Sequence, residues 1–126
     1  MTRHHFAHLI TLSALTLWPV AHAQDVNISP QEIKATWSDK TINGVIQGGP
    51  LAGKSIEMHL KSDSSADIGG AITDTGTWRL SDSGYCATWK KIRAGQERCF
   101  TVIRKGTEQH VFNPDGSLNS IVTQVR

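Results

Sequence analysis

The sequence predicts a mostly β protein: a small antiparallel meander barrel or half-barrel of about seven short strands, with one N-terminal helix after a cleaved signal peptide. Three observations predict this fold. The first residues have the layout of an export signal, short runs of alternating apolar and polar residues fill the chain from residue 41 onward, and turn-forming residues separate those runs. Because only about 100 residues follow the signal, the strands must curl to bury a core.

Residues 1–23 are predicted to be a secretory signal peptide. Arg3 and the amino terminus supply positive charge, residues 9–18 form a short, mostly apolar run, and Ala21-His22-Ala23 is a small-x-small cleavage signal. The apolar run is shorter than the ~20 residues that span a bilayer, so we expect no transmembrane segment in the mature chain. We therefore expect a single β-rich domain over 24–126, periplasmic in a bacterium or secreted.

The mature chain is expected to be nearly neutral. Four of the six histidines and Arg3 lie in the signal peptide, so 12 of the 13 Lys and Arg residues remain against 11 Asp and Glu. Net charge therefore does not identify a partner, and export makes a nucleic-acid partner unexpected. An oxidising compartment also allows the two cysteines to form a lasting disulfide.

The first structured element is predicted to be a short helix from Ser29 to about Asp39. Ser29 can cap it, Pro30 suits its first position, and Glu32 stands three residues after the cap, as in a capping box. Trp37 lies four residues after Ile33 and shares its face, so we expect that face to be buried.

Strands follow wherever the apolar period becomes two. The runs that we interpret as strands begin at Thr41 and continue over 56–61, 66–73, 77–80, 85–91, 97–105, 107–112 and 117–125. Their separators are rich in Gly, Ser, Asp and Pro, and residues 113–116 have a type I turn sequence. The paired glycines at 69–70 indicate a bulge or bend.

The pairing of Cys86 with Cys99 would set the register of the 85–105 hairpin. Because side chains alternate across a strand, this register puts one apolar set on a single face, which we expect to point inward: Tyr85, Ala87, Trp89, Phe100 and Val102. The disulfide would close a short loop, and its entropic stabilisation is roughly 3 kcal/mol.

Two short motifs are interpreted as turns. Residues 48–55 match the phosphate-loop pattern G-x-x-x-x-G-K-[ST], but the next residues alternate like a strand instead of starting the helix that such a loop needs. Asp74-Thr75-Gly76 has the letters of an aspartic-protease motif, whose chemistry requires two carboxylates sharing a proton.

His59 and His110 are the only histidines of the mature chain, and each is a candidate base or metal ligand. We favour surface or interstrand positions for both, because no Cys/His cluster has metal-ligand spacing. No serine stands in a nucleophile-elbow sequence either. We expect no enzymatic activity, no metal and no cofactor.

Two sets of residues are candidates for binding. An aromatic set is expected either to line a ligand pocket in the barrel mouth or to form the core. It comprises Trp37, Trp78, Tyr85, Trp89 and Phe100. A basic set is expected either to attract an anionic partner or to form a solvated hairpin with charged edges. It comprises Lys90, Lys91, Arg93, Arg98, Arg104 and Lys105.

Several short motifs are shared with a known family. They are Gly76-x-Trp78, Cys86-x-x-Trp89 and Cys99-Phe100-x-Val102, followed by Gly106, Phe112 and Asp115-Gly116. Together they resemble small exported bacterial proteins of the domain-of-unknown-function 995 type. The resemblance covers most of the mature chain and implies a periplasmic β-rich domain. It implies no assigned activity and no catalytic residues.

The function predicted from these observations is binding without catalysis. The leading hypothesis is a periplasmic or secreted domain that binds a small molecule or an envelope component. The alternative is a protein-interaction module, such as an inhibitor of a secreted enzyme, that uses the basic hairpin 90–105. A third hypothesis, an enzyme using His59 or His110 with a carboxylate, has the least support.

Overall fold

The computed structural model describes residues 10–16 and 24–126. Most of the predicted signal peptide, residues 1–9 and 17–23, therefore lies outside the described residues. Residues 10–16 are exposed and have no regular secondary structure.

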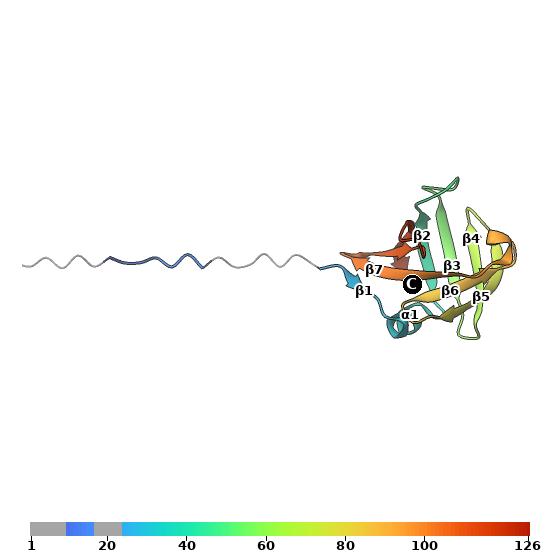
Figure 1. The fold of residues 1–126 in the computed structure, drawn as a ribbon, viewed down its shortest axis with the longest axis horizontal. Helices are drawn as coiled ribbons and strands as arrows, with labels where there is room; N and C mark the ends of the chain where they lie inside the picture. Colours follow the sequence, from blue (N-terminus) through green and yellow to red (C-terminus); the bar gives the residue numbers. More distant parts are fainter. Residues whose placement is uncertain (1–9, 17–23) are drawn as a thin grey trace, which may run out of the picture.

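The fold is a closed antiparallel barrel of eight strands with one helix, as the sequence predicts (Figure 1). The barrel strands are β2 (Thr41–Ile46), β3 (Ser55–Leu60), β4 (Ser65–Gly70), β5 (Asp74–Leu80), β6 (Tyr85–Trp89), β7 (Arg98–Lys105), β8 (Glu108–Phe112) and β9 (Leu118–Val125). Each strand pairs with the next, and β9 closes the barrel by pairing with β2. A two-residue strand, β1 (Val26–Asn27), pairs with β7 beyond the point where β6 leaves it.

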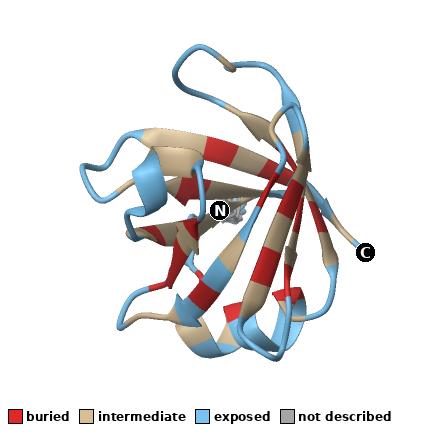
Figure 2. Ribbon diagram, turned by 90° about the vertical axis from the view of Figure 1, so that its right-hand side faces the viewer, coloured by how far each residue is buried: buried red, intermediate tan, exposed pale blue. Residues whose placement is uncertain are grey.

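The two ends of the barrel differ. Because the strands alternate in direction, the connections 47–54, 71–73, 90–97 and 113–117 all lie at one end, which we call the loop end. The connections 61–64, 81–84 and 106–107 lie at the other end, together with helix α1 (Pro30–Trp37), and we call this the helix end. Along the strands, buried positions alternate with less buried ones, as a barrel with one wet face requires (Figure 2).

Helix α1 begins as predicted but ends two residues early. The Ser29 hydroxyl accepts a hydrogen bond from the Glu32 amide at 3.1 Å, and Pro30 occupies the first turn. The Glu32 carboxylate does not complete a capping box, since it pairs with Arg104 on β7. The helix ends at Trp37, because Asp39 has a left-handed backbone (φ 59°) that redirects the chain into β2.

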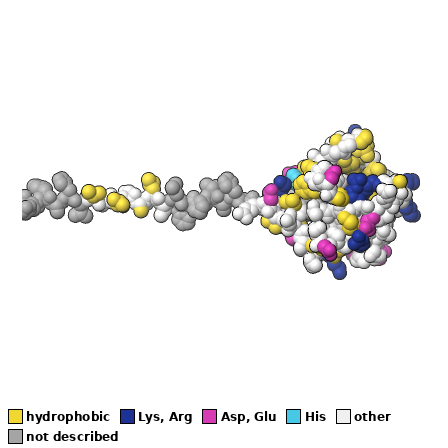
Figure 3. Space-filling view, in the orientation of Figure 1, with side chains coloured by type: hydrophobic (Ala, Val, Ile, Leu, Met, Phe, Trp, Pro, Cys, Tyr) yellow, Lys and Arg dark blue, Asp and Glu magenta, His cyan; other side chains and the backbone are white. Residues whose placement is uncertain are grey.

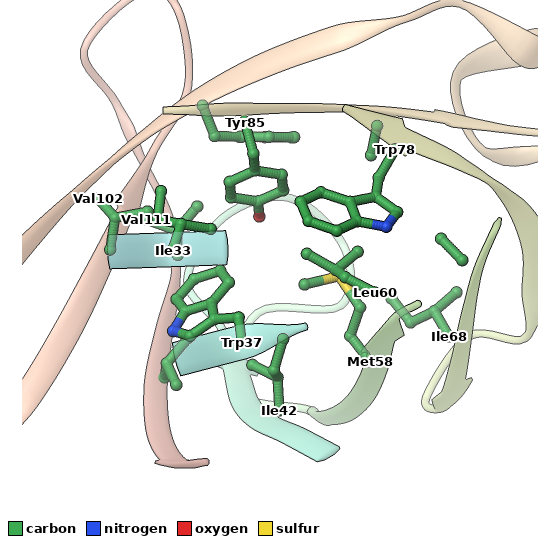
Figure 4. Packing of buried hydrophobic residues seen from close by; sticks show 14 of the residues in the cluster. Ile33, Trp37, Ile42, Met58, Leu60, Ile68, Trp78, Tyr85, Val102 and Val111 are labelled. Atoms are coloured by element: carbon green, nitrogen blue, oxygen red, sulfur yellow. The ribbon is translucent and has the colours of Figure 1, made fainter. Parts of the chain in front are cut away.

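Trp37 anchors the helix over the barrel. Its side chain is fully buried, its ring meets the Tyr85 ring edge-on at 5.6 Å between centroids, and its indole N–H donates to the side chain of Gln109 at 3.1 Å. Figure 4 shows Trp37 between Ile33 and Ile42 in the buried cluster. The helix therefore seals the helix end with apolar surface, and the polar edge of the indole has a partner.

The cysteine register is confirmed at its three central pairs: Tyr85 faces Phe100, Cys86 faces Cys99, and Ala87 faces Arg98. Cys86 and Cys99 are joined as a disulfide. The predicted inward set of five is buried throughout. The two strands are shorter than predicted, because β6 ends at Trp89 and β7 begins at Arg98. A short 3₁₀ turn, η1 (Ile92–Gly95), lies in the predicted connection between them.

Candidate functional site

The barrel encloses a cavity of about 350 Å³ next to its loop end. Loop residues at its rim come from 47–54, 71–73 and η1, and none comes from the connections of the helix end. Its walls are inward positions of the strands: Ile42, Gly44, Ile46, Ile56, Met58, Ile68, Tyr85, Ala87, Trp89, Phe100, Val111, Ser120 and Val122. The cavity is therefore a mostly apolar space. The core closes it toward the helix end, and it is reached through the loops of the loop end.

The structure divides the predicted aromatic set. Tyr85, Trp89 and Phe100 line the cavity. Trp37 does not, because it is the last residue of α1 and is buried at the helix end. Trp78 is also buried outside the cavity, with its indole N–H donating to the carbonyl of Lys61 at 2.7 Å.

Arg93 is the only charged residue among the described residues that line the cavity. Its guanidinium carbon lies 5.5 Å from the centroid of the buried Phe100 ring, which is a cation–π distance. The Nε atom of Arg93 is buried, and no atom of the described residues accepts a hydrogen bond from it. Burial lowers the pKa of Arg93, and the neighbouring charge of Arg98 lowers it further.

The backbone of η1 is held in an uncommon conformation. Arg93 and Ala94 both have left-handed dihedrals, with φ of 54° and 52°. Each such non-glycine residue costs on the order of 1 kcal/mol, and it persists only where surrounding contacts fix it. This conformation places the half-buried Arg93 side chain at the rim of the cavity.

Asp74, the first residue of β5, fixes the start of that loop. One carboxylate oxygen accepts hydrogen bonds from the amides of Lys91 and Ile92 at 2.8 and 2.9 Å, and the other accepts one from the Thr75 amide at 2.8 Å. Burial alone would raise the pKa of Asp74, but these three hydrogen bonds outweigh burial and hold the pKa below its usual value. The turn interpretation of residues 74–76 is therefore wrong: the turn lies at 71–73, and Asp74 is a buried anchor.

Sequence reasoning placed Arg93 in a surface patch and missed Asp74 as a supporting residue. The distance along the chain between Asp74 and the amides it binds explains the omission, since those contacts arise only when β5 and β6 are paired. The one local signal was an aspartate at the start of an alternating run, which also fits an ordinary turn.

The six basic residues do not form one surface. Arg98 begins β7 at the loop end, near the exposed Lys90 and Lys91, whereas the last two of the six lie at the opposite end of the strand. There Arg104 pairs with Glu32, and Lys105 pairs with Asp25 at 2.9 Å. On the face shown in Figure 3, basic side chains are spread out and acidic ones lie beside several of them. This arrangement weakens the case for a single docking patch along 90–105.

His59 lies on the outer face of the barrel between strands β2 and β4. One ring nitrogen is 2.5 Å from the Asp67 carboxylate, and the other is 3.1 Å from the Thr41 hydroxyl. The order hydroxyl, imidazole, carboxylate is that of a nucleophilic triad. None of the three residues lines the cavity, and none lines the second pocket among the described residues, which lies around Lys34, Ser62 and Trp78. His110 lies on β8 beside Phe112 and Glu108.

Within residues 10–16 and 24–126, one group of side chains has metal-binding spacing: Cys86, Glu97 and Cys99. Both cysteines of that group are in the disulfide. In the same ranges, no helix has the length and apolar character needed to cross a membrane.

No protein-family model, no curated protein and no solved structure matches this chain. The resemblance to the domain-of-unknown-function 995 type stays a prediction. The cavity and its lining therefore carry the functional argument.

Proposed function

We propose that this protein binds a small, mostly apolar molecule inside the barrel, as a non-enzymatic domain of the periplasm or of the secreted fraction. The observation that carries the proposal is the cavity of about 350 Å³, which lies within the size range of ligand sites in proteins, roughly 300–1,000 Å³. The leader sequence and the disulfide pair support export.

The energetics of an empty cavity favour this function. Unfilled core volume costs about 24 cal/mol per Å³, so a dry void of this size would cost up to about 8 kcal/mol. That is comparable with the whole folding free energy of a small domain, which is about 5–15 kcal/mol. Water entering from the loop end lowers the cost but makes few hydrogen bonds against such walls. A ligand that replaces this water with apolar contacts gains free energy.

A neutral apolar fluorophore tests the proposal. N-phenyl-1-naphthylamine is titrated into the oxidised protein, and its emission is followed together with quenching of the tryptophan fluorescence, to which the cavity-lining Trp89 contributes. We expect saturable binding with one site per chain. Native mass spectrometry of protein from a periplasmic fraction should also show added mass that is lost on denaturation. Absence of saturable binding, together with a bare monomer mass, contradicts the proposal and redirects attention to a protein partner of the loop end.

A further inference from the structure

We infer that the ligand of the cavity is an amphipathic anion, with a carboxylate head at Arg93 and an apolar body directed toward Met58 and Val122. This inference rests on the proposed function, because it names the chemical class of the ligand that the cavity binds. It goes further in assigning Arg93 as the residue that selects the head group.

Arg93 has no counter-charge among the described residues that line the cavity. A guanidinium offers five N–H donors in a planar fork that suits a carboxylate. Here part of that fork is buried with no acceptor among the described residues, and the described cavity lining contains no Asp or Glu. A buried donor without a partner is costly, and a buried charge is more costly still. A ligand anion at this position supplies the missing acceptor and the missing counter-charge.

The loop holds the backbone that carries Arg93. The amides of Lys91 and Ile92 donate hydrogen bonds to Asp74, and the backbone at Arg93 and Ala94 is left-handed. The Arg93 guanidinium lies over the Phe100 ring. An arginine in a flexible surface loop would extend into water and keep its hydration. The strained backbone at Arg93 and Ala94 therefore keeps a cation at the rim of an apolar cavity.

The remaining polar groups at the cavity agree with a head group near the loop end. Asn119 and Ser120 line it from β9, close to the 113–117 turn, whereas Tyr85, the first residue of β6, lies deeper in the cavity beside Trp37. Burial raises the pKa of the Tyr85 hydroxyl, so it stays a neutral donor and acceptor. Deeper positions, such as Met58, Ile68 and Val122, are apolar, which suits a hydrocarbon body.

Volume limits the size of the body. At about 20–30 Å³ for each non-hydrogen atom, a space of about 350 Å³ holds roughly ten to twenty such atoms. A saturated monocarboxylate of about ten carbons fits within this limit. An inorganic anion would satisfy Arg93 but leave the apolar walls hydrated.

The experiment compares three ten-carbon probes of similar shape by displacement of N-phenyl-1-naphthylamine: decanoate, 1-decanol and decylamine. Acetate is added as a head group without a body. We expect decanoate to bind at least about tenfold more tightly than 1-decanol, since a charge-assisted hydrogen bond in a desolvated site contributes that much or more. Decylamine should bind most weakly, because its ammonium would meet Arg93, and acetate should not compete at millimolar concentration.

Three variants locate the effect. Arg93→Gln should lower decanoate affinity by about ten- to hundredfold and change 1-decanol affinity by less than about threefold. Arg93→Lys keeps the charge and should recover a large part of the decanoate affinity. Arg98→Gln is the matched control, because Arg98 neighbours Arg93 but does not line the cavity, and it should leave decanoate affinity within about threefold.

The outcomes separate the two proposals. If no probe and no fluorophore binds, both the cavity function and the head-group assignment fail. If 1-decanol and decanoate bind equally, or if Arg93→Gln weakens both to the same extent, the cavity function stands and the assignment of Arg93 is overturned. A decanoate preference that disappears in Arg93→Gln and persists in Arg98→Gln supports the assignment.

Discussion

Filling the cavity with protein atoms tests whether the space exists and whether it binds. Ala87, on β6, points into the cavity from its wall. Ala87→Ile adds three carbons there, and the new side chain is β-branched, which suits a strand. Burying three carbons in available space stabilises by up to about 2.4 kcal/mol, at about 0.8 kcal/mol each.

Ala66→Ile is the matched control. Ala66 is as well buried as Ala87 and also lies on a strand, but it does not line the cavity. The same three carbons then enter filled core and should destabilise by about 1–3 kcal/mol. The two variants therefore change the free energy of unfolding in opposite directions, although they make the same chemical change.

Urea denaturation followed by tryptophan fluorescence measures both effects. With a slope of about 1–3 kcal/mol per molar urea, the gain for Ala87→Ile moves the midpoint upward by roughly 1 M, and the Ala66→Ile midpoint moves downward by a similar amount. Ala87→Ile should also exclude N-phenyl-1-naphthylamine. If Ala87→Ile destabilises as much as Ala66→Ile does, no usable space adjoins Ala87 and the cavity argument is refuted.

Four further changes have defined outcomes. Replacing Cys86 and Cys99 by alanine should cost roughly 3 kcal/mol of stability from loop entropy alone, measured by urea denaturation against the oxidised wild type. Gly76→Ala should cost about 1–3 kcal/mol or more, because the added methyl would overlap a carbonyl oxygen of β6; an unchanged thermal midpoint contradicts the tight strand approach. Asp74→Asn should weaken decanoate binding more than 1-decanol binding, and should speed amide exchange at 91 and 92 before elsewhere. Hydrogen bonding to His59, and then to Lys61, holds the pKa of Asp67 below its usual value, so its contribution to stability is present above about pH 4 and is lost as the pH falls; Asp67→Asn should flatten the stability profile in that acidic range.

The barrel could be predicted because its determinants are local. Alternating residues mark strands without any knowledge of their partners, and the two cysteines set the register of one hairpin by themselves. That register correctly placed Tyr85, Ala87 and Phe100 on the inner face. The same reasoning predicted the helix from its cap and its buried tryptophan.

The cavity could not be predicted, because it depends on volumes summed over eight strands. Apolar inward residues look the same in sequence whether they meet across a filled core or surround a space. Whether Trp37 and Trp89 belong to core or pocket is decided by the end of the barrel at which each lies: Trp37 belongs to α1 at the helix end, and Trp89 ends β6 next to the loop end. The register of a hairpin contains no information about the height of each pair along the barrel axis.

The 90–97 loop could not be predicted from sequence either, because its conformation depends on where the strands stop pairing and on a distant residue. Sequence alternation extended the two strands into this region, but the pairing of β6 with β7 stops at Ala87 and Arg98, and the amides of the loop need partners once the pairing stops. Asp74, anchored on the neighbouring strand, supplies two of those partners from seventeen and eighteen residues away. The strained turn that results carries Arg93 inward. A basic residue that sequence alone assigns to the surface therefore becomes the one charged group among the described residues that line an apolar cavity, and the preference between decanoate and 1-decanol measures directly what that charge does.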